Sequence, residues 1–119
     1  MRADNIAMSG SITPAVISLV DATNIATDAS KGNHFRVTIA GNRTLQNPSN
    51  LVDGQRLVWE IQQDGTGGRT ITLDTLFSTP NNVPSVILTT TPNQWSLIAA
   101  IYNGSINKVV VTGFLQQYS

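Results

Sequence analysis

The sequence predicts a small all-β protein, a sandwich or barrel of seven or eight short strands. Two observations support this fold class. Short apolar or alternating runs recur about every 8–12 residues and are separated by Gly, Pro, Asn and Asp, and no run carries convincing helical periodicity. The 119 residues fit one domain with one core. We therefore expect an extended N-terminal arm over residues 1–14 and a single β-sandwich domain over residues 15–119.

The first half of the chain contains two clear strand candidates and two weaker ones. Ala15–Val20 is a β-rich apolar run, and a weak strand lies near Asn24–Ala26 between turn residues. His34–Ala40 alternates apolar and polar residues, as a half-buried strand does. After the turn formers Gly41 and Asn42, Arg43–Leu45 can continue as a further strand.

The second half contains five predicted strands. Arg56–Gln63 alternates, and so does Arg69–Leu73. Ser85–Thr90, Gln94–Tyr102 and Ser105–Tyr118 are rich in β-branched and apolar residues. The apolar residues of Gln94–Tyr102 do not alternate, which indicates a strand buried on both faces, in a sandwich or at a subunit contact.

Two turn signals indicate hairpins. Asn103-Gly104 is the preferred pair of a two-residue type I′ turn and joins the last two predicted strands. Asp64-Gly65 begins the glycine-rich stretch "QDGTGGRTIT", Gln63–Thr72. A phosphate-binding loop would need a Lys after the glycines and a following helix. Neither is present, so we interpret this stretch as a second hairpin turn.

Composition excludes several function classes. Charged residues are 12% of the chain and the net charge is zero, so no electrostatic signal points to nucleic acid or an anionic membrane. The absence of Cys and the single His argue against a zinc site, and we assign no metal or cofactor. No run is long enough to cross a membrane, and the N-terminus shows no signal-peptide core. The polar surface rests on Thr, Ser, Asn and Gln, which suits contacts with other subunits or an ordinary neutral domain.

Catalytic candidates are sparse. Glu60 is the only acid in the middle of a predicted strand, where we expect it to be solvated, and a glycosidase needs two positioned carboxylates. His34 begins a strand on its polar face, where a surface or loop-packing role is expected. No partnered nucleophile occurs in a recognisable motif. We therefore predict that the protein is not an enzyme and assign no catalytic residue.

Three residues are candidates for binding. Trp59 and Trp95 could stack on a sugar, but each lies in an apolar strand, so core packing is the favoured role. Arg69 could contact a ligand, although an ion pair with Asp64 or Asp74 is the more ordinary role for an Arg at a strand start.

The central part of the chain resembles a module that recurs in tailed-bacteriophage proteins. The resemblance rests on "GNRTL", Asn47-Pro48, Asn50, Gly54-Gln55 and "QDGTGGRT", within Gly41–Thr72. The stretches "PSVILTTTPNQWSLIAAIY" and "KVVVTGF" look like the closing half of the module. It implies a jelly-roll-like β-sandwich of antiparallel strands, often trimeric, in virion structural proteins such as capsid decoration (cement) proteins and tail-fibre or baseplate parts.

From this resemblance we predict a phage virion structural protein, first of all a capsid decoration protein that binds and stabilises the assembled head. The alternative is a tail-fibre or baseplate component that binds the host surface or a carbohydrate. A glycan hydrolase using Glu60 is a third hypothesis. The expected partners are the major capsid protein or other virion subunits, in a homotrimer, with no nucleic acid and no membrane. The partner-binding candidates in the N-terminal arm are Arg2, Asn5, Ile6, Met8 and Ile12.

Overall fold

The chain folds into nine strands and no helix within the residues described by the computed structural model, 15–79 and 86–119. The strands are β1 (Val16–Ser18), β2 (Asn24–Ile25), β3 (His34–Ile39), β4 (Arg43–Leu45), β5 (Arg56–Gln63), β6 (Ile71–Leu73), β7 (Phe77–Ser78), β8 (Trp95–Asn103) and β9 (Lys108–Tyr118). The all-β prediction is confirmed. In this part of the chain no helix is long and apolar enough to span a membrane.

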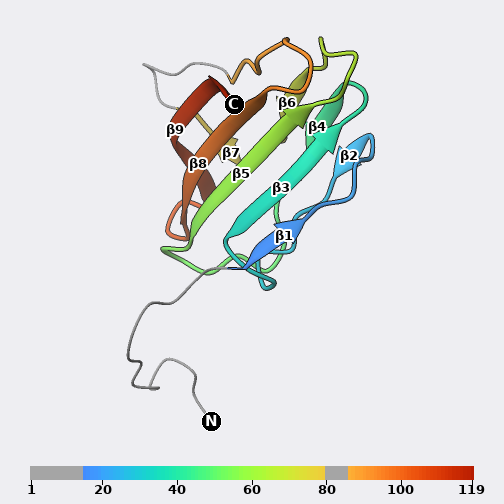
Figure 1. The fold of residues 1–119 in the computed structure, drawn as a ribbon. Helices are drawn as coiled ribbons and strands as arrows, with labels where there is room; N and C mark the ends of the chain where they lie inside the picture. Colours follow the sequence, from blue (N-terminus) through green and yellow to red (C-terminus); the bar gives the residue numbers. More distant parts are fainter. Residues whose placement is uncertain (1–14, 80–85) are drawn as a thin grey trace, which may run out of the picture.

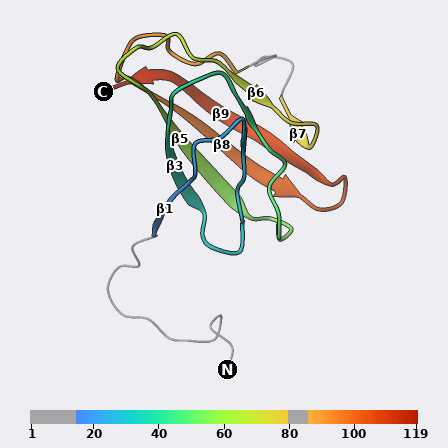
Figure 2. The same cartoon turned by 90° about the vertical axis from the view of Figure 1, so that its right-hand side faces the viewer.

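The strands form two sheets of unequal width. The larger sheet has six strands in the order β1-β3-β5-β8-β9-β7, and the smaller has three in the order β2-β4-β6 (Figure 1). The two sheets lie in separate layers when the molecule is turned (Figure 2). Their facing side chains belong to one buried cluster that contains Phe35 and Trp59 of the large sheet and Ile25, Leu45 and Ile71 of the small one.

The first six strands wind as a coil of three turns. Each turn places one strand in the large sheet (β1, β3, β5) and the next in the small sheet (β2, β4, β6), and successive turns pair in parallel. Equivalent apolar residues stack from turn to turn: Ile17 beside Phe35 beside Trp59. The prediction of antiparallel strands is therefore wrong for these pairs and for β7–β9. Only β5–β8 and β8–β9 are antiparallel among the described strands.

This winding differs from a jelly roll, which is built from antiparallel Greek keys. The reason lies in the connections: after β1, β3 and β5 the chain crosses to the other layer instead of folding back beside itself. It does so because an apolar residue that follows each turn, such as Leu45 or Ile71, is buried against the large sheet. The predicted strand Ser85–Thr90 is also absent, since residues 86–90 are irregular, with Leu88 buried.

Trp59 is the centre of the core. Its side chain has no exposed surface, and its ring lies 5.9 Å from that of Phe35 and 5.5 Å from that of Phe77. The indole Nε1–H donates a 3.0 Å hydrogen bond to Oγ1 of Thr27, so the one polar atom of the buried ring is paired. Core packing, the favoured prediction for Trp59, is confirmed.

The two predicted hairpin turns have different outcomes. β8 and β9 do form an antiparallel hairpin, but Asn103 pairs with Lys108, so the loop has four residues rather than two. The stretch Gln63–Thr70 is not a hairpin turn at all. It carries the chain from β5 in the large sheet to β6 in the small sheet, and we call this connection the third arch.

Candidate functional site

The outward side of the large sheet carries the most developed polar and aromatic cluster of the described residues. Along β3, β5 and β8, buried residues alternate with partly exposed ones. The strand register aligns the latter in rows across the sheet, with Arg36 beside Glu60 and Glu60 beside Leu97. We call this side the outer face; its members include His34, Arg36, Thr38, Val58, Glu60, Gln62, Trp95, Leu97, Ala99 and Ile101.

Glu60 organises one end of the outer face. Its Oε1 accepts hydrogen bonds from Arg36 Nε at 3.0 Å and Nη2 at 2.9 Å, and lies 2.6 Å from His34 Nε2. Its Oε2 accepts a hydrogen bond from the hydroxyl of Tyr118, at the end of β9. Only 13% of the Glu60 side chain is exposed. The carboxylate therefore holds three side chains from two other strands in fixed positions.

The pKa values of this cluster follow from these contacts. Burial raises the pKa of Glu60, but the hydrogen bonds from Tyr118, His34 and Arg36 together outweigh burial and leave the pKa at about 2. Burial and the neighbouring carboxylate raise the pKa of Tyr118. The general acid of a glycosidase needs a raised pKa, whereas the pKa of Glu60 is lowered. The expectation of a solvated position for Glu60 is wrong.

Trp95 lies on the outer face beside this cluster. Its ring stacks on that of Tyr118 at 6.4 Å with an interplanar angle of 27°, and the guanidinium of Arg36 lies 5.7 Å from its centroid. A pocket of about 200 Å³ opens next to it, lined also by Ser18, Leu19, Arg36, Val37 and Thr38. Core packing is thus wrong for Trp95, which is partly exposed on a sheet surface.

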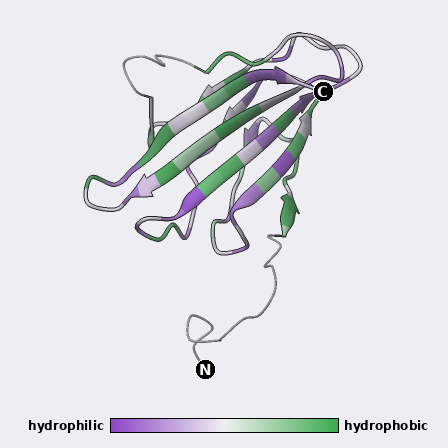
Figure 3. Ribbon diagram, turned by 60° about the vertical axis from the view of Figure 1, so that its left-hand side comes forward, coloured by the Kyte–Doolittle hydropathy of each residue, from purple (hydrophilic) through white to green (hydrophobic). Residues whose placement is uncertain are grey.

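The alternation of β8 explains this error. Ser96, Ile98 and Ala100 are buried, whereas Leu97, Ala99 and Ile101 on the other face are equally apolar but partly exposed. Figure 3 shows the result: hydrophobic colour is continuous over the middle of β8 but alternates along β3. Sequence alone could not tell which face of this strand is buried, and hence where Trp95 points.

The other single candidates have structural partners. His34 lies partly exposed on the outer face, as expected for a surface residue, and is held against Glu60. Arg69 forms the expected ion pair with Asp64, at 3.0 Å between Nη2 and Oδ2. Asp74 does not pair with Arg69 and instead accepts hydrogen bonds from the backbone of Asn47 and Thr75.

The residues of "QDGTGGRT" build the third arch. The buried amide of Gln63 donates to the carbonyls of Arg69 and Thr89 and accepts from the Arg69 N–H at 3.0 Å. Asp64 accepts from the N–H groups of Thr66 and Gly67, and its ion pair with Arg69 closes the loop. These contacts give the stretch a structural role in the fold.

The residues of "GNRTL" and the loop after it connect successive turns of the coil. Arg43 pairs with Asp21 of the preceding turn at 2.8 Å, which lowers the pKa of Asp21. Asn42 Oδ1 accepts from the Thr70 N–H of the following turn. Asn47 Oδ1 accepts from the Leu76 N–H. The side chains that carry the resemblance thus maintain the coil and are distinct from the Glu60 cluster.

Gln55 also connects successive turns by hydrogen bonds, at the other end of the coil. Its Nε2 donates to the Ala29 carbonyl and to Oδ1 of Asn33, both at 2.9 Å.

The arm candidates Arg2, Asn5, Ile6, Met8 and Ile12 lie outside the described residues. Within residues 15–79 and 86–119, no group of three or more His, Cys, Asp or Glu residues could hold a metal ion.

The fold and the outer face define a non-helical, two-sheet module in which a partly exposed aromatic pair is held by a polar network. Residues 14–107, which are 94 of the 119, match the family described as "Putative phage tail fibre C-terminal domain". The chain belongs to this family. No curated protein matches the chain, and no solved structure matches it.

Family membership supports the predicted phage virion structural protein. It favours the tail-fibre alternative over the capsid decoration protein that we placed first, since the family is one of tail-fibre domains. A virion location follows, with the tail as a possible site, and the capsid surface is not confirmed.

Proposed function

We propose that this chain is a tail-fibre domain that binds a carbohydrate of the host surface on its outer face, at Trp95 and Tyr118. The observation that carries the proposal is the stacked pair of these two rings beside an open pocket of about 200 Å³. An aromatic surface offers an apolar platform with polar groups at its edge, which is the composition of a small-ligand site.

The network around Glu60 supports a binding role. It fixes Tyr118 and Arg36 beside Trp95 before any ligand arrives, and preorganised side chains lose less freedom on binding. Because Arg36 is already paired with Glu60, the site offers no unbalanced charge, which favours a neutral sugar over an acidic one. Ser18 and Thr38 in the adjoining pocket supply hydroxyl groups for the ligand.

The test compares two substitutions on the large sheet. Trp95→Ala removes the platform, and Leu115→Ala removes an apolar side chain that is 55% exposed on β9. Binding of the purified variants to host cells and to an array of host-surface glycans is measured. We expect at least a tenfold loss for Trp95→Ala and less than a twofold change for Leu115→Ala. Unchanged binding by folded Trp95→Ala would refute the assignment of this site.

A second experiment addresses the place in the virion. Antibodies against the protein are bound to intact phage particles and located by electron microscopy. Label at the tail is the expected result. Label distributed over the head would restore the capsid-decoration hypothesis and remove the reason for seeking a host ligand.

A further inference from the structure

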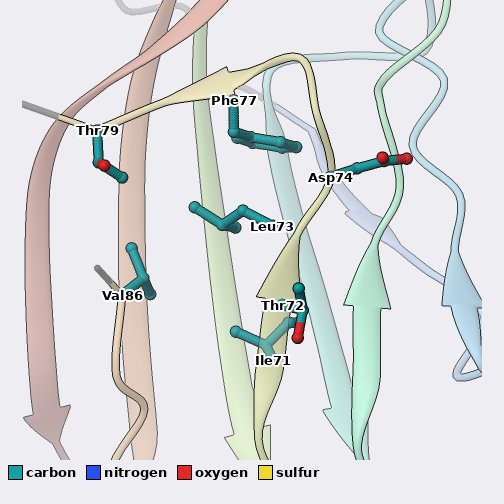
Figure 4. Close-up of a pocket in the computed structure, with 7 residues that line it drawn as sticks. All are labelled: Ile71, Thr72, Leu73, Asp74, Phe77, Thr79 and Val86. Carbon is teal, nitrogen blue, oxygen red and sulfur yellow. The ribbon is translucent and has the colours of Figure 1, made fainter. Parts of the chain in front are cut away.

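Aspartate side chains hold backbone N–H groups of neighbouring segments at several places in the described part of the chain. Asp74 points away from the pocket beside β6 (Figure 4) and accepts the Asn47 N–H at 3.1 Å. Asp53 accepts the Gly104 N–H at 2.7 Å, from a loop 51 residues further along the chain. The second contact differs in its chemistry, because the N–H that Asp53 holds belongs to an Asn-Gly pair, Asn103-Gly104.

An Asn-Gly pair can modify itself. The backbone nitrogen of the glycine loses its proton to a base and attacks Cγ of the Asn side chain. The bond from Cγ to the side-chain nitrogen then breaks, this nitrogen takes a proton from water and leaves as ammonia, and a five-membered succinimide remains. Water adds to either carbonyl carbon of the ring, which opens to Asp or to isoaspartate. Asn103-Gly104 is the only Asn-Gly pair in the sequence.

The loop that contains this pair is open to solvent and requires its glycine. Asn103, Gly104 and Ser105 are exposed, and Oδ1 of Asn103 accepts the Ser105 N–H at 3.0 Å, which polarises the carbonyl that is attacked. A Cβ at position 104 would lie 3.0 Å from Cβ of Asp53. The close approach of the two loops therefore keeps at position 104 the residue that hinders ring closure least.

The hydrogen bond to Asp53 opposes ring closure. An amide N–H lies in the plane of its peptide group, and after deprotonation the attacking electron pair occupies the direction of the former N–H bond. For Gly104 this direction points to Oδ1 of Asp53. The carboxylate also repels the negative charge that develops on the nitrogen. Attack on Cγ of Asn103 therefore requires this hydrogen bond to break and the peptide group to rotate.

The turn that carries Asp53 is itself fixed to the large sheet. The Gln55 N–H donates to the Val52 carbonyl at 2.9 Å, which closes the turn. The Gly54 N–H donates to the Tyr102 carbonyl, and the Tyr102 N–H donates to the Gln55 carbonyl, both at 2.9 Å. These bonds attach the turn to the end of β8, so the carboxylate stays beside the loop whose N–H it accepts.

We propose that Asn103 is a deamidation site and that Asp53 slows its deamidation by holding the Gly104 N–H. The product would carry one added negative charge a single residue away from the Asp53 contact, and like charges this close repel each other. Deamidation would therefore weaken the contact between the two loops. The proposal is independent of glycan binding, since Asn103 and Trp95 lie at opposite ends of β8.

Peptide mapping by mass spectrometry tests the proposal. The natural chain, folded and in denaturant, and the folded variant Asp53→Ala are incubated in mildly alkaline buffer, and conversion of Asn103 to Asp and isoaspartate is followed. We expect slower conversion in the folded natural chain than in the denatured one. Asp53→Ala should raise the folded rate about tenfold, which corresponds to about 1.4 kcal/mol of activation free energy.

Asp64→Ala is the matched control. It also removes a carboxylate that accepts two backbone N–H groups, those of Thr66 and Gly67, but it lies in the third arch, beyond the other end of β8. The rate at Asn103 should not change in this variant. A rate raised as much as in Asp53→Ala would overturn the proposal, because any loss of stability would then explain both.

The same digests report on an exposed Asn elsewhere in the fold. Asn93 lies in the turn before β8 and is followed by Gln94. Acceleration at Asn103 without acceleration at Asn93 is the expected result for Asp53→Ala. Equal acceleration at both would mean that the variant only unfolds, and would overturn the role of Asp53. An unchanged or slower rate at Asn103 would do the same, and no conversion even in denaturant would remove the site.

Discussion

Alanine substitutions at three glycines of the third arch test whether this connection is fixed by a close backbone approach. Gly67 and Gly68 both have φ of 74°, where a residue with a Cβ is strained. At Gly67 a Cβ would also lie 2.6 Å from the Thr90 carbonyl oxygen and 3.0 Å from the Pro92 ring, whereas at Gly68 it would meet nothing within 4 Å. Gly65 has open space and no positive φ. Comparing the three variants therefore separates the cost of backbone strain from the cost of a steric clash.

The expected losses differ in size. Gly68→Ala should cost about 1–2 kcal/mol, the usual penalty of a left-handed residue. Gly67→Ala adds a contact that only backbone movement can relieve, at about 1–3 kcal/mol more. Gly65→Ala should stay within about 0.5 kcal/mol. For a chain of this length roughly 4 °C of unfolding temperature corresponds to 1 kcal/mol, so calorimetry resolves the order. Equal losses at Gly67 and Gly68 would refute the close approach to Thr90.

Three further outcomes are expected. Because the pKa of Glu60 lies at about 2, below its usual 4.5, its contribution to the free energy of unfolding is complete above pH 4.5 and is lost as pH falls towards 2. In denaturant titrations over this pH range, the free energy of unfolding of Glu60→Gln should change by roughly 3 kcal/mol less than that of the natural chain. An equal dependence on pH in the two proteins would contradict the network. Thr27→Val should lower the free energy of unfolding by about 1–3 kcal/mol, since it leaves the buried Trp59 N–H without an acceptor, while Thr27→Ser should not. Asn47→Ala should cost about 1–2 kcal/mol through its lost bond to the β6–β7 turn, and Gln46→Ala, at an exposed neighbour, under 0.5 kcal/mol in the same assay.

The faces of single strands could be predicted because burial on one side imposes a two-residue alternation. Phe35, Val37 and Ile39 are buried as expected, and so are Leu57, Trp59 and Ile61. Each of these strands belongs to the large sheet and turns its polar residues outward. The alternation depends only on residues within the strand, so no knowledge of its neighbours is needed.

Strand pairing could not be predicted, because alternation does not say which sheet the next strand joins. An Asp-Gly pair favours a tight turn equally in a hairpin and in an arch, so it does not distinguish the two. The buried Gln63, which fixes the third arch, has no distinguishing local pattern. The three turns also escaped detection as a repeat because their lengths differ: Phe35 follows its partner Ile17 by 18 residues, whereas Trp59 follows Phe35 by 24.

The candidate site could not be predicted from the sequence for a related reason. Glu60 and Tyr118 are 58 residues apart and meet only because β8 lies between β5 and β9 and sets their register. No local motif encodes that contact. Trp95 joins it through a strand whose two faces are equally apolar, so the residue most relevant to binding carried no signal of exposure.

The residues that carry the family resemblance and the candidate binding residues lie in different parts of the module. This separation bears on how the module could change its ligand. Arg43, Asn47 and Gln55 are committed to hydrogen bonds between successive turns, and Gln63 to bonds within the third arch, so substitutions there disturb the coil itself. Trp95 lies on a strand outside the coil, with its ring on the outer face. A side chain there can be exchanged without removing any bond between turns. If the outer face binds the host, specificity can therefore vary while the coil is retained, and a sequence signature built on the arches identifies the fold without identifying the ligand.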